Sequence, residues 1–212
     1  MIALYAITRH PTPPVTTGRG IRVVASGDLA VVCGPVITSD VTADALWQHE
    51  RIVESLMDDR DVLPVRYGTC LPDDAAAAEA IDKNHASYAA LLETVRGAAE
   101  LAVRVFASAD SPPAPLPSAG SMTGTDYLRA RARAVDEESD ASTRVHEPLA
   151  AIARAATVAG ANRAGELLRA AYLVDRNATE SFSARVGDIQ TSNPQLRITC
   201  TGPWPPYSFA RP

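Results

Sequence analysis

The sequence predicts an α+β fold in two domains, and three observations support this prediction. Two Val-rich runs, 21–25 and 29–33, flank Ser26-Gly27-Asp28, a pattern typical of a β-hairpin with a glycine-containing turn. Helical patterns then cross between further strand patterns. A Pro-rich stretch at 108–124 interrupts all regular periodicity and reads as a linker. We therefore expect an N-terminal domain at 1–107 and a C-terminal domain at 125–212.

The first half is expected to be a modified ferredoxin-like domain. A helix is predicted to begin at a cap on Ser39 or Asp40 and to end at Met57, with Leu46 on its inner face. A second, long helix is predicted at 75–96. Because two helices cross between strands, we expect one face of the sheet to be covered. The predicted strands lie at 2–7, 21–25, 29–33, 62–66 and 100–107.

The stretch 62–69 is the most specific pattern in this half. A charged turn, 58–61, precedes it, and Gly68 closes it. Pro64 cannot donate a ladder hydrogen bond, so we expect it on an edge strand or at a bulge. Arg66 and Tyr67 should leave the strand on opposite faces. Arg66 is interpreted as a buried ion-pair partner or, alternatively, as a contact residue.

The second half also mixes helices and strands. A charged helix is predicted at 126–141, with a solvated face rather than a basic binding strip. An amphipathic helix follows at 143–158, then a strand at 167–174. A helix capped by Asp175 or Asn177 is predicted to reach Ile189. The last predicted strand is 195–201.

The chain ends in an aromatic and Pro-rich tail. Its prolines favour an extended backbone, so its aromatic side chains are presented at low entropic cost. We expect the tail to dock on its own chain between the domains, with Trp204 largely buried, because an exposed aromatic cluster favours aggregation. The tail residues concerned are Trp204, Pro205, Pro206, Tyr207 and Phe209.

Composition narrows the function. The formal net charge of −5 and the lack of a basic tract argue against nucleic acid as the main partner. Residues 1–8 lack the features of a signal peptide, and no apolar run has the roughly 18 residues that a membrane helix needs. Three widely spaced cysteines, Cys33, Cys70 and Cys200, fit small core residues in a reducing cytoplasm.

Motifs for catalysis or metal binding are missing from the sequence. It contains no phosphate-binding loop, HExxH motif, Cys/His cluster or GxSxG elbow. Glu50 and Glu54 lie one helical turn apart, but His49 does not share a face well with Glu54, so we expect no metal site there. We therefore expect a protein that is not an enzyme and carries no cofactor.

Two stretches resemble the gas vesicle protein F/L (GvpF/GvpL) family. One runs from His49-Glu50 through 62–69, and the other is Gly202–Phe209. The resemblance implies a ferredoxin-like N-terminal domain and an α+β C-terminal domain with long helices. It also implies an assembly factor that binds the hydrophobic shell protein GvpA and limits its aggregation, with other gas vesicle accessory proteins as further candidate partners. The candidate partner-binding or family-motif residues are Leu63, Pro64, Arg66, Tyr67, Gly68 and Thr69.

Three functions remain open from the sequence. The leading hypothesis is an assembly factor that binds the shell protein through its N-terminal domain. The second is a permanent structural component of the vesicle surface. The third is a small-molecule enzyme or sensor with a site between the domains, in which Arg66 and Tyr67 would supply polar groups.

Overall fold

The computed structural model describes residues 1–11, 20–36, 41–108, 140–160 and 165–210. Their contacts divide the chain into two compact units. The first unit combines Met1–Glu100 with Trp204–Pro212, and the second contains Leu101–Pro203. The first unit is thus built from both ends of the chain. Among the described residues, no helix is both long and apolar enough to span a membrane.

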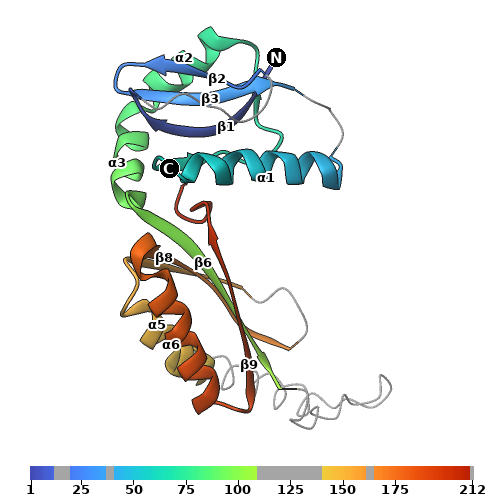
Figure 1. Ribbon diagram of the computed structural model, residues 1–212, viewed down its shortest axis with the longest axis vertical. Helices are drawn as coiled ribbons and strands as arrows, with labels where there is room; N and C mark the ends of the chain where they lie inside the picture. The colour runs from blue at the N-terminus through green and yellow to red at the C-terminus, as the bar shows by residue number, and fades with distance from the viewer. Residues whose placement is uncertain (12–19, 37–40, 109–139, 161–164, 211–212) are drawn as a thin grey trace, which may run out of the picture. The chain divides into compact units, whose positions relative to one another are not determined.

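An antiparallel sheet forms the centre of the first unit (Figure 1). Its strands are β1 (Ile2–Arg9), β2 (Arg22–Ser26), β3 (Leu29–Pro35), β4 (Val62–Pro64) and the short β5 (Cys70–Leu71). The order is β2-β3-β1-β4, and β5 also pairs with β1. The predicted hairpin is confirmed: β2 and β3 pair antiparallel from Arg22↔Cys33 to Ser26↔Leu29.

Three helices accompany this sheet: α1 (Ala43–Met57), α2 (Asp74–Lys83) and α3 (His85–Val95). Thr42 caps α1 by accepting a hydrogen bond from the Ala45 amide, whereas the predicted caps, Ser39 and Asp40, lie outside the described residues. The single long helix predicted at 75–96 is wrong. Asn84 interrupts it, because its side-chain amide donates to Ala80 O and its backbone leaves the helical region.

Both faces of the first sheet are covered, which corrects the prediction of one covered face. Val31 and Val32 are consecutive on β3 and point to opposite faces, yet both are buried. Val32 packs with Ile52 and Leu56 of α1. The helices α2 and α3 contact the strands as well. The inner face of α1 consists of Ala45, His49, Ile52, Val53 and Leu56, so the expected inward position of Leu46 is wrong.

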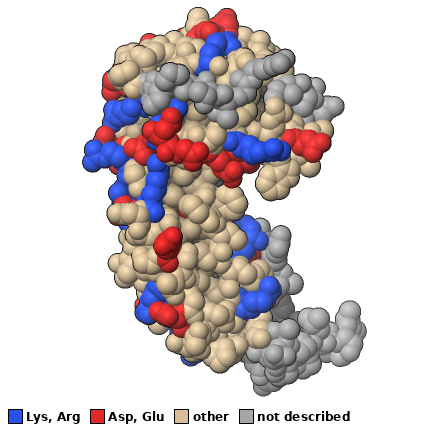
Figure 2. Space-filling view, in the orientation of Figure 1, with Lys and Arg blue, Asp and Glu red and all other residues tan. Residues whose placement is uncertain are grey.

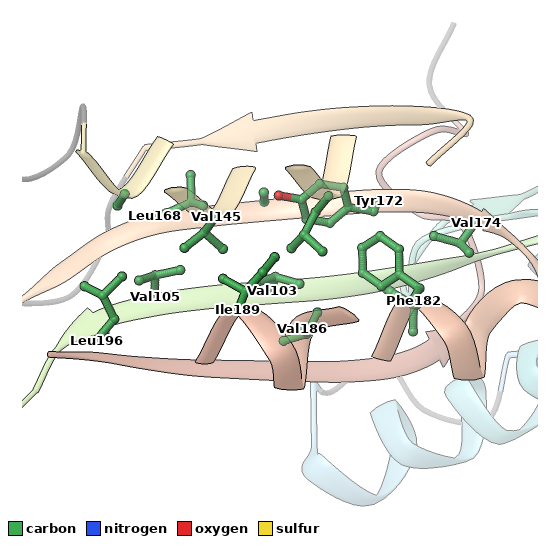
Figure 3. Packing of buried hydrophobic residues seen from close by; sticks show 14 residues of the cluster. Val103, Val105, Val145, Leu168, Tyr172, Val174, Phe182, Val186, Ile189 and Leu196 are labelled. Atoms are coloured by element: carbon green, nitrogen blue, oxygen red, sulfur yellow. The ribbon is translucent and has the colours of Figure 1, made fainter. Parts of the chain in front are cut away.

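A second antiparallel sheet, ordered β7-β8-β6-β9, belongs to the second unit (Figure 3). Its strands are β6 (Ala98–Ala107), β7 (Ala155–Ala159), β8 (Glu166–Asp175) and β9 (Leu196–Trp204). A π-helical turn, Ser142–His146, leads into α5 (Glu147–Ala150), and a 3-10 turn, Arg176–Ala178, leads into α6 (Thr179–Ser192). The strand predicted at 167–174 and the last strand are confirmed.

Aromatic and aliphatic side chains from α6 and the strands form the core of the second unit. Figure 3 shows Phe182 and Val186 of α6 facing Val103 of β6 and Tyr172 of β8. The Tyr172 and Phe182 rings lie 5.2 Å apart between centroids. His146 Nδ1 lies 2.9 Å from the Tyr172 hydroxyl, and burial raises the pKa of that hydroxyl. The buried tyrosine thus keeps a polar partner.

Several predicted assignments in this region need correction. The strand predicted at 100–107 is real, but it lies in the second sheet as β6, so it does not complete a domain at 1–107. Residues 155–158 form a strand, β7, and not the end of a helix. The tail belongs to the first unit and not to the C-terminal half. The predicted linker, apart from Ser108, and residues 126–139 of the charged helix lie outside the described residues.

Candidate functional site

The segment 63–69, here called the motif turn, leaves the edge of the first sheet. The Val65 amide donates to Tyr5 O at 2.8 Å. Because successive backbone amides point in opposite directions, the Pro64 nitrogen points away from β1, as its edge position predicted. The Thr69 amide then donates to Arg66 O at 3.2 Å, and Gly68 has a positive φ of 85°. This is the geometry of a turn that favours glycine at its third position.

Arg66 and Tyr67 face different cavities. Arg66 is exposed and lines one cavity, so its interpretation as a buried ion-pair partner is wrong. Tyr67 is half-buried and lines the other. The two side chains line different cavities, but they lie in the turn after β4, which ends at Pro64, and not on a strand as predicted.

The C-terminal segment, defined here as Trp204–Phe209, docks on the first unit through two carboxylates. The Tyr207 hydroxyl donates to Glu50 Oε1 at 2.9 Å. The Ser208 amide and hydroxyl donate to Glu100 Oε2 and Oε1 at 2.7 and 2.8 Å. Glu100 is buried, so these donors compensate part of the cost of burying its charge. Burial, followed by the nearby Glu50 carboxylate, raises the pKa of Tyr207.

The tail docks on its own chain, within the first unit, and the predicted burial of Trp204 is wrong. Pro205 and Pro206 are buried, whereas Trp204 is 40% exposed. Glu50 and Glu100 bind Tyr207 and Ser208. The segment is therefore held by these hydrogen bonds more than by the Trp204 side chain. Because Trp204 is only partly buried, its removal should leave no large cavity in the core.

The motif turn and the C-terminal segment meet at a shared cavity of about 210 Å³, here called the motif–tail pocket. The side of the motif turn is formed by Leu63–Arg66 and Thr69. Tyr88 of α3 and Ile7 of β1 close the opposite side, and Tyr207 and Ala210 come from the end of the chain. The motif turn and the C-terminal segment are far apart in the sequence, but they line the same cavity.

A larger cavity of about 280 Å³ lies beside Tyr67. We call it the apolar pocket, because its lining is mostly hydrophobic or aromatic. Strands β1 and β5, helix α1, the motif turn and residues just outside these elements all contribute. The lining consists of Met1, Ala3, Tyr5, Val36, Val41, Ala45, His49, Tyr67, Gly68 and Cys70.

His49 is the buried polar residue of the apolar pocket. Its Nε2 lies 2.8 Å from Val65 O, and because a carbonyl can only accept, the ring donates this hydrogen bond. The ring stacks on Tyr5 at 5.1 Å and meets Tyr67 edge-on at 5.6 Å. Burial lowers the pKa of His49 from its ordinary value of 6.5. The neutral imidazole therefore lines the pocket as an aromatic ring, and its hydrogen bond joins α1 to the motif turn.

Two exposed hydrophobic side chains line this pocket, and two more lie on α1, the helix that contributes Ala45 and His49 to it. Met1 and Val41 line it and are 79% and 82% exposed. Trp47 and Leu46, near the beginning of α1, are 61% and 42% exposed. We call these four residues the apolar rim. Exposed apolar groups gathered in one region typically mark an interaction site.

Charged groups follow a different pattern. On the face shown in Figure 2, basic and acidic side chains of the first unit are interspersed and are not gathered by sign. Arg9 pairs with Asp28 at 3.0 Å and with Glu93 at 2.6 Å, and Arg22 Nε contacts Asp74 at 3.1 Å. Within the described ranges, no group of three His, Cys, Asp or Glu side chains is arranged to hold a metal ion.

The sequence identified the motif turn and the tail but missed the residues that surround them. Glu50 attracted attention as half of an acidic pair, although its observed role is to hold Tyr207. Glu100 could have been noticed as an acid within the apolar run 98–103. Met1 and Val41 carry no local signal, because distant segments bring them to the apolar pocket.

Comparison with known proteins assigns the family. The family model described as "Gas vesicle synthesis protein GvpL/GvpF" matches residues 2–211. The chain belongs to the GvpL/GvpF family. The resemblance that the two motifs suggested is thereby confirmed, and GvpL/GvpF proteins take part in gas vesicle formation.

Individual GvpL/GvpF relatives agree along nearly the whole chain. Gas vesicle protein L of Streptomyces sp. (strain CB03234) is 31% identical, covering 98% of this chain and 91% of the relative. Gas vesicle protein F of the same strain is 27% identical, covering 97% and 98%.

Two crystal structures of GvpF share the fold. The protein from Anabaena sp. PCC7120 matches with a TM-score of 0.83 at 18% identity, covering 100% of this chain and 96% of that one. GvpF from Microcystis aeruginosa matches with a TM-score of 0.77 at 17% identity, covering 100% and 99%. The α+β fold of this chain is therefore that of GvpF.

Proposed function

We propose that this protein is a non-enzymatic assembly factor that binds the hydrophobic shell protein GvpA and limits its aggregation during gas vesicle formation. The observation that supports this proposal most directly is the apolar pocket with its apolar rim. A soluble protein that binds an aggregation-prone hydrophobic subunit needs an apolar surface that the subunit can cover. The first unit has a mostly apolar cavity of about 280 Å³, with Met1 and Val41 exposed in its lining and Leu46 and Trp47 exposed on the adjoining helix α1.

The pocket and its rim suit an apolar side chain better than a polar metabolite. Three aromatic rings, those of Tyr5, His49 and Tyr67, form one wall. The ring nitrogen of His49 is already engaged with Val65 O. A small-molecule enzyme or sensor that used Arg66 and Tyr67 together is disfavoured, because these side chains line separate cavities.

A binding experiment with purified shell protein tests the proposal. We expect Trp47→Asp or Val41→Asp to weaken binding of GvpA to the full chain by about tenfold or more, because each places a charge within the apolar contact. The matched control is Ile152→Asp, which changes a side chain of similar exposure, 52%, in the second unit. Light scattering should show that the unmodified chain suppresses aggregation of the shell protein and that the rim variants do so less.

The outcomes separate the alternatives. Unchanged binding by both rim variants, or equal loss with Ile152→Asp, would contradict the assignment to this surface. Washed vesicles that retain the protein firmly, together with no effect on aggregation, would instead identify a permanent structural component of the vesicle.

A further inference from the structure

The strands at the ends of the two sheets differ in how their edges are protected. Soluble proteins usually place charges, prolines or covering elements on such edges, because unpaired backbone groups recruit other strands. In the first sheet, Arg22 and Ser26 of β2 bond to Asp74 and Asp82 of α2. Pro64 lies in β4 at the opposite edge. In the second sheet, β9 contains Arg197 and Pro203.

Among the described residues, strand β7 has none of these protective features. Its sequence, Ala-Ala-Thr-Val-Ala over residues 155–159, contains no charge and no proline. Within the described part of the chain it pairs with β8 alone, at the end of the second sheet. Residues 156–159 are exposed, and Val158 has 53% of its side chain accessible. Alternate backbone amides and carbonyls of β7 point away from β8 and can therefore bond to another strand. The side chains along this edge carry no charge.

The sequence of β7 is complementary to itself. An antiparallel pairing of two copies, centred on Thr157, places Thr157 opposite Thr157, Ala156 opposite Val158, and Ala155 opposite Ala159. A threonine pair is favourable across strands, and the alanine and valine pairs add neither a charge nor a steric conflict. This register leaves no side chain of β7 opposite a like charge.

The charges that flank β7 also tolerate this arrangement. Arg154 precedes the strand and forms an ion pair with Asp175 of its own unit. In the symmetric register Arg154 lies opposite Gly160 of the second copy, so two Arg154 side chains do not meet. The Arg154 residues of the two copies are six residues apart along the strand direction, or about 20 Å.

We propose that β7 is a dimerisation edge that pairs antiparallel with β7 of a second copy of this chain. The pairing joins two four-stranded sheets into one sheet of eight strands through a two-fold axis at Thr157, the commonest symmetry of homodimers. A five-residue strand pair buries little area, so the dimer forms and dissociates with concentration. This inference is independent of the proposed function, because it involves a different unit and a different partner.

Sedimentation over a concentration series tests the dimer. The full chain should move from the mass of one chain, 22.4 kDa, towards twice that value as concentration rises. Thr157→Lys should abolish this shift, since the two-fold axis places the new charges opposite each other. The matched control, Thr199→Lys, adds the same charge to an exposed position of the other edge strand, β9, and should leave dimerisation unchanged.

Cysteine crosslinking tests the register. Opposite residues of an antiparallel pair have Cα atoms about 4.5–5.5 Å apart, which allows a disulfide. Thr157→Cys should therefore give a 157–157 disulfide under mild oxidation, identified by peptide mapping so that Cys33, Cys70 and Cys200 do not confuse the result. Ala155→Cys should not, because its two copies lie about 14 Å apart along the strands.

Three results would overturn the proposal. One is a monomer throughout the concentration series, and another is a dimer that persists in Thr157→Lys. The third is crosslinking of Ala155→Cys as efficient as that of Thr157→Cys. Protection of β7 amides from hydrogen exchange only after shell protein is added would assign the edge to a different partner.

Discussion

His49 connects the motif turn to α1, and its burial makes stability depend on pH. The ring donates to Val65 O and lies between Tyr5 and Tyr67, beside the carboxylate of Glu50. Burial lowers its pKa, so the folded protein holds the neutral ring where the unfolded chain would bind a proton. Well above pH 6.5 neither state is protonated there, and His49 adds no pH dependence.

We therefore predict that the free energy of unfolding falls as pH drops from about 6.5 towards the folded-state pKa of His49. The contribution of this one group approaches at most about 1.4 kcal/mol per pH unit. His49→Gln should reduce that slope, measured by urea unfolding at several pH values. The control is His10→Gln. His10 is exposed and directly follows β1, so this variant should keep the slope of the unmodified chain. An equal slope in His49→Gln would contradict a buried, neutral His49.

Predictions for single residues succeeded where local backbone rules decide and failed where distant neighbours decide. The edge position of Pro64 follows from its missing amide hydrogen. The positive φ of Gly68 agrees with its place at the end of the motif. By contrast, the exposure of Arg66 and Trp204 depends on which remote segments pack over them, and the sequence carries no signal for that.

At the scale of elements, the C-terminal segment depends on a few polar contacts. The hydrogen bond from Tyr207 to Glu50 joins residues 157 positions apart. We predict that Tyr207→Phe lowers the free energy of unfolding by about 1–2 kcal/mol, since a hydrogen bond to a carboxylate is lost. Tyr88→Phe is the matched control: Tyr88 is also half-buried and lines the motif–tail pocket, so its change should cost little.

A double-mutant cycle isolates this contact. Glu50→Ala and Tyr207→Phe should each destabilise the protein, and together they should cost less than the sum of the two, because both remove the same bond. Strict additivity of the two changes would show that Tyr207 stabilises the segment by packing alone.

The elements themselves could be predicted to different degrees. The β2–β3 hairpin and β8 were found because dense Val, Leu and Tyr patterns lie beside clear turns. Residues 155–158 were assigned to a helix because alanine fits a helical period as well as a strand. The alternation of apolar and polar residues predicted that β6 is a strand. It could not predict the sheet to which β6 belongs, because such a pattern does not specify the neighbouring strands.

For the whole molecule, the family motifs identified the right stretches but not the site that they build. The apolar pocket draws on residues from 1 to 70, and the motif–tail pocket spans residues 7 to 210. Contacts at such separations are fixed by tertiary packing, which periodicity and composition do not encode.

The division into units predicts that residues 1–107 do not make a complete domain. Such a fragment lacks Trp204–Pro212, so Glu100 loses its Ser208 donors and the motif–tail pocket loses one side. It also carries residues 101–107 of β6 without their partner strands. We predict lower stability and more aggregation than in the full chain, measured by urea unfolding and light scattering.

A fusion provides the control. Joining residues 204–212 to residue 100 through a short Gly-Ser linker should restore stability relative to residues 1–100 alone, since Ser208 can then reach Glu100. Equal stability of 1–100 with and without residues 204–212 would show that the C-terminal segment is dispensable for the first unit.

The order in which the ribosome makes the chain gives this arrangement a further meaning. Domains usually fold in the order of their synthesis, N-terminal first. Here the first hundred residues emerge early, yet the segment that closes their unit is translated only after the whole second unit. Ile7, Leu63 and Tyr88 line the motif–tail pocket with Tyr207, which is translated long after them. A growing chain therefore exposes an open pocket until Tyr207 has been translated and can dock.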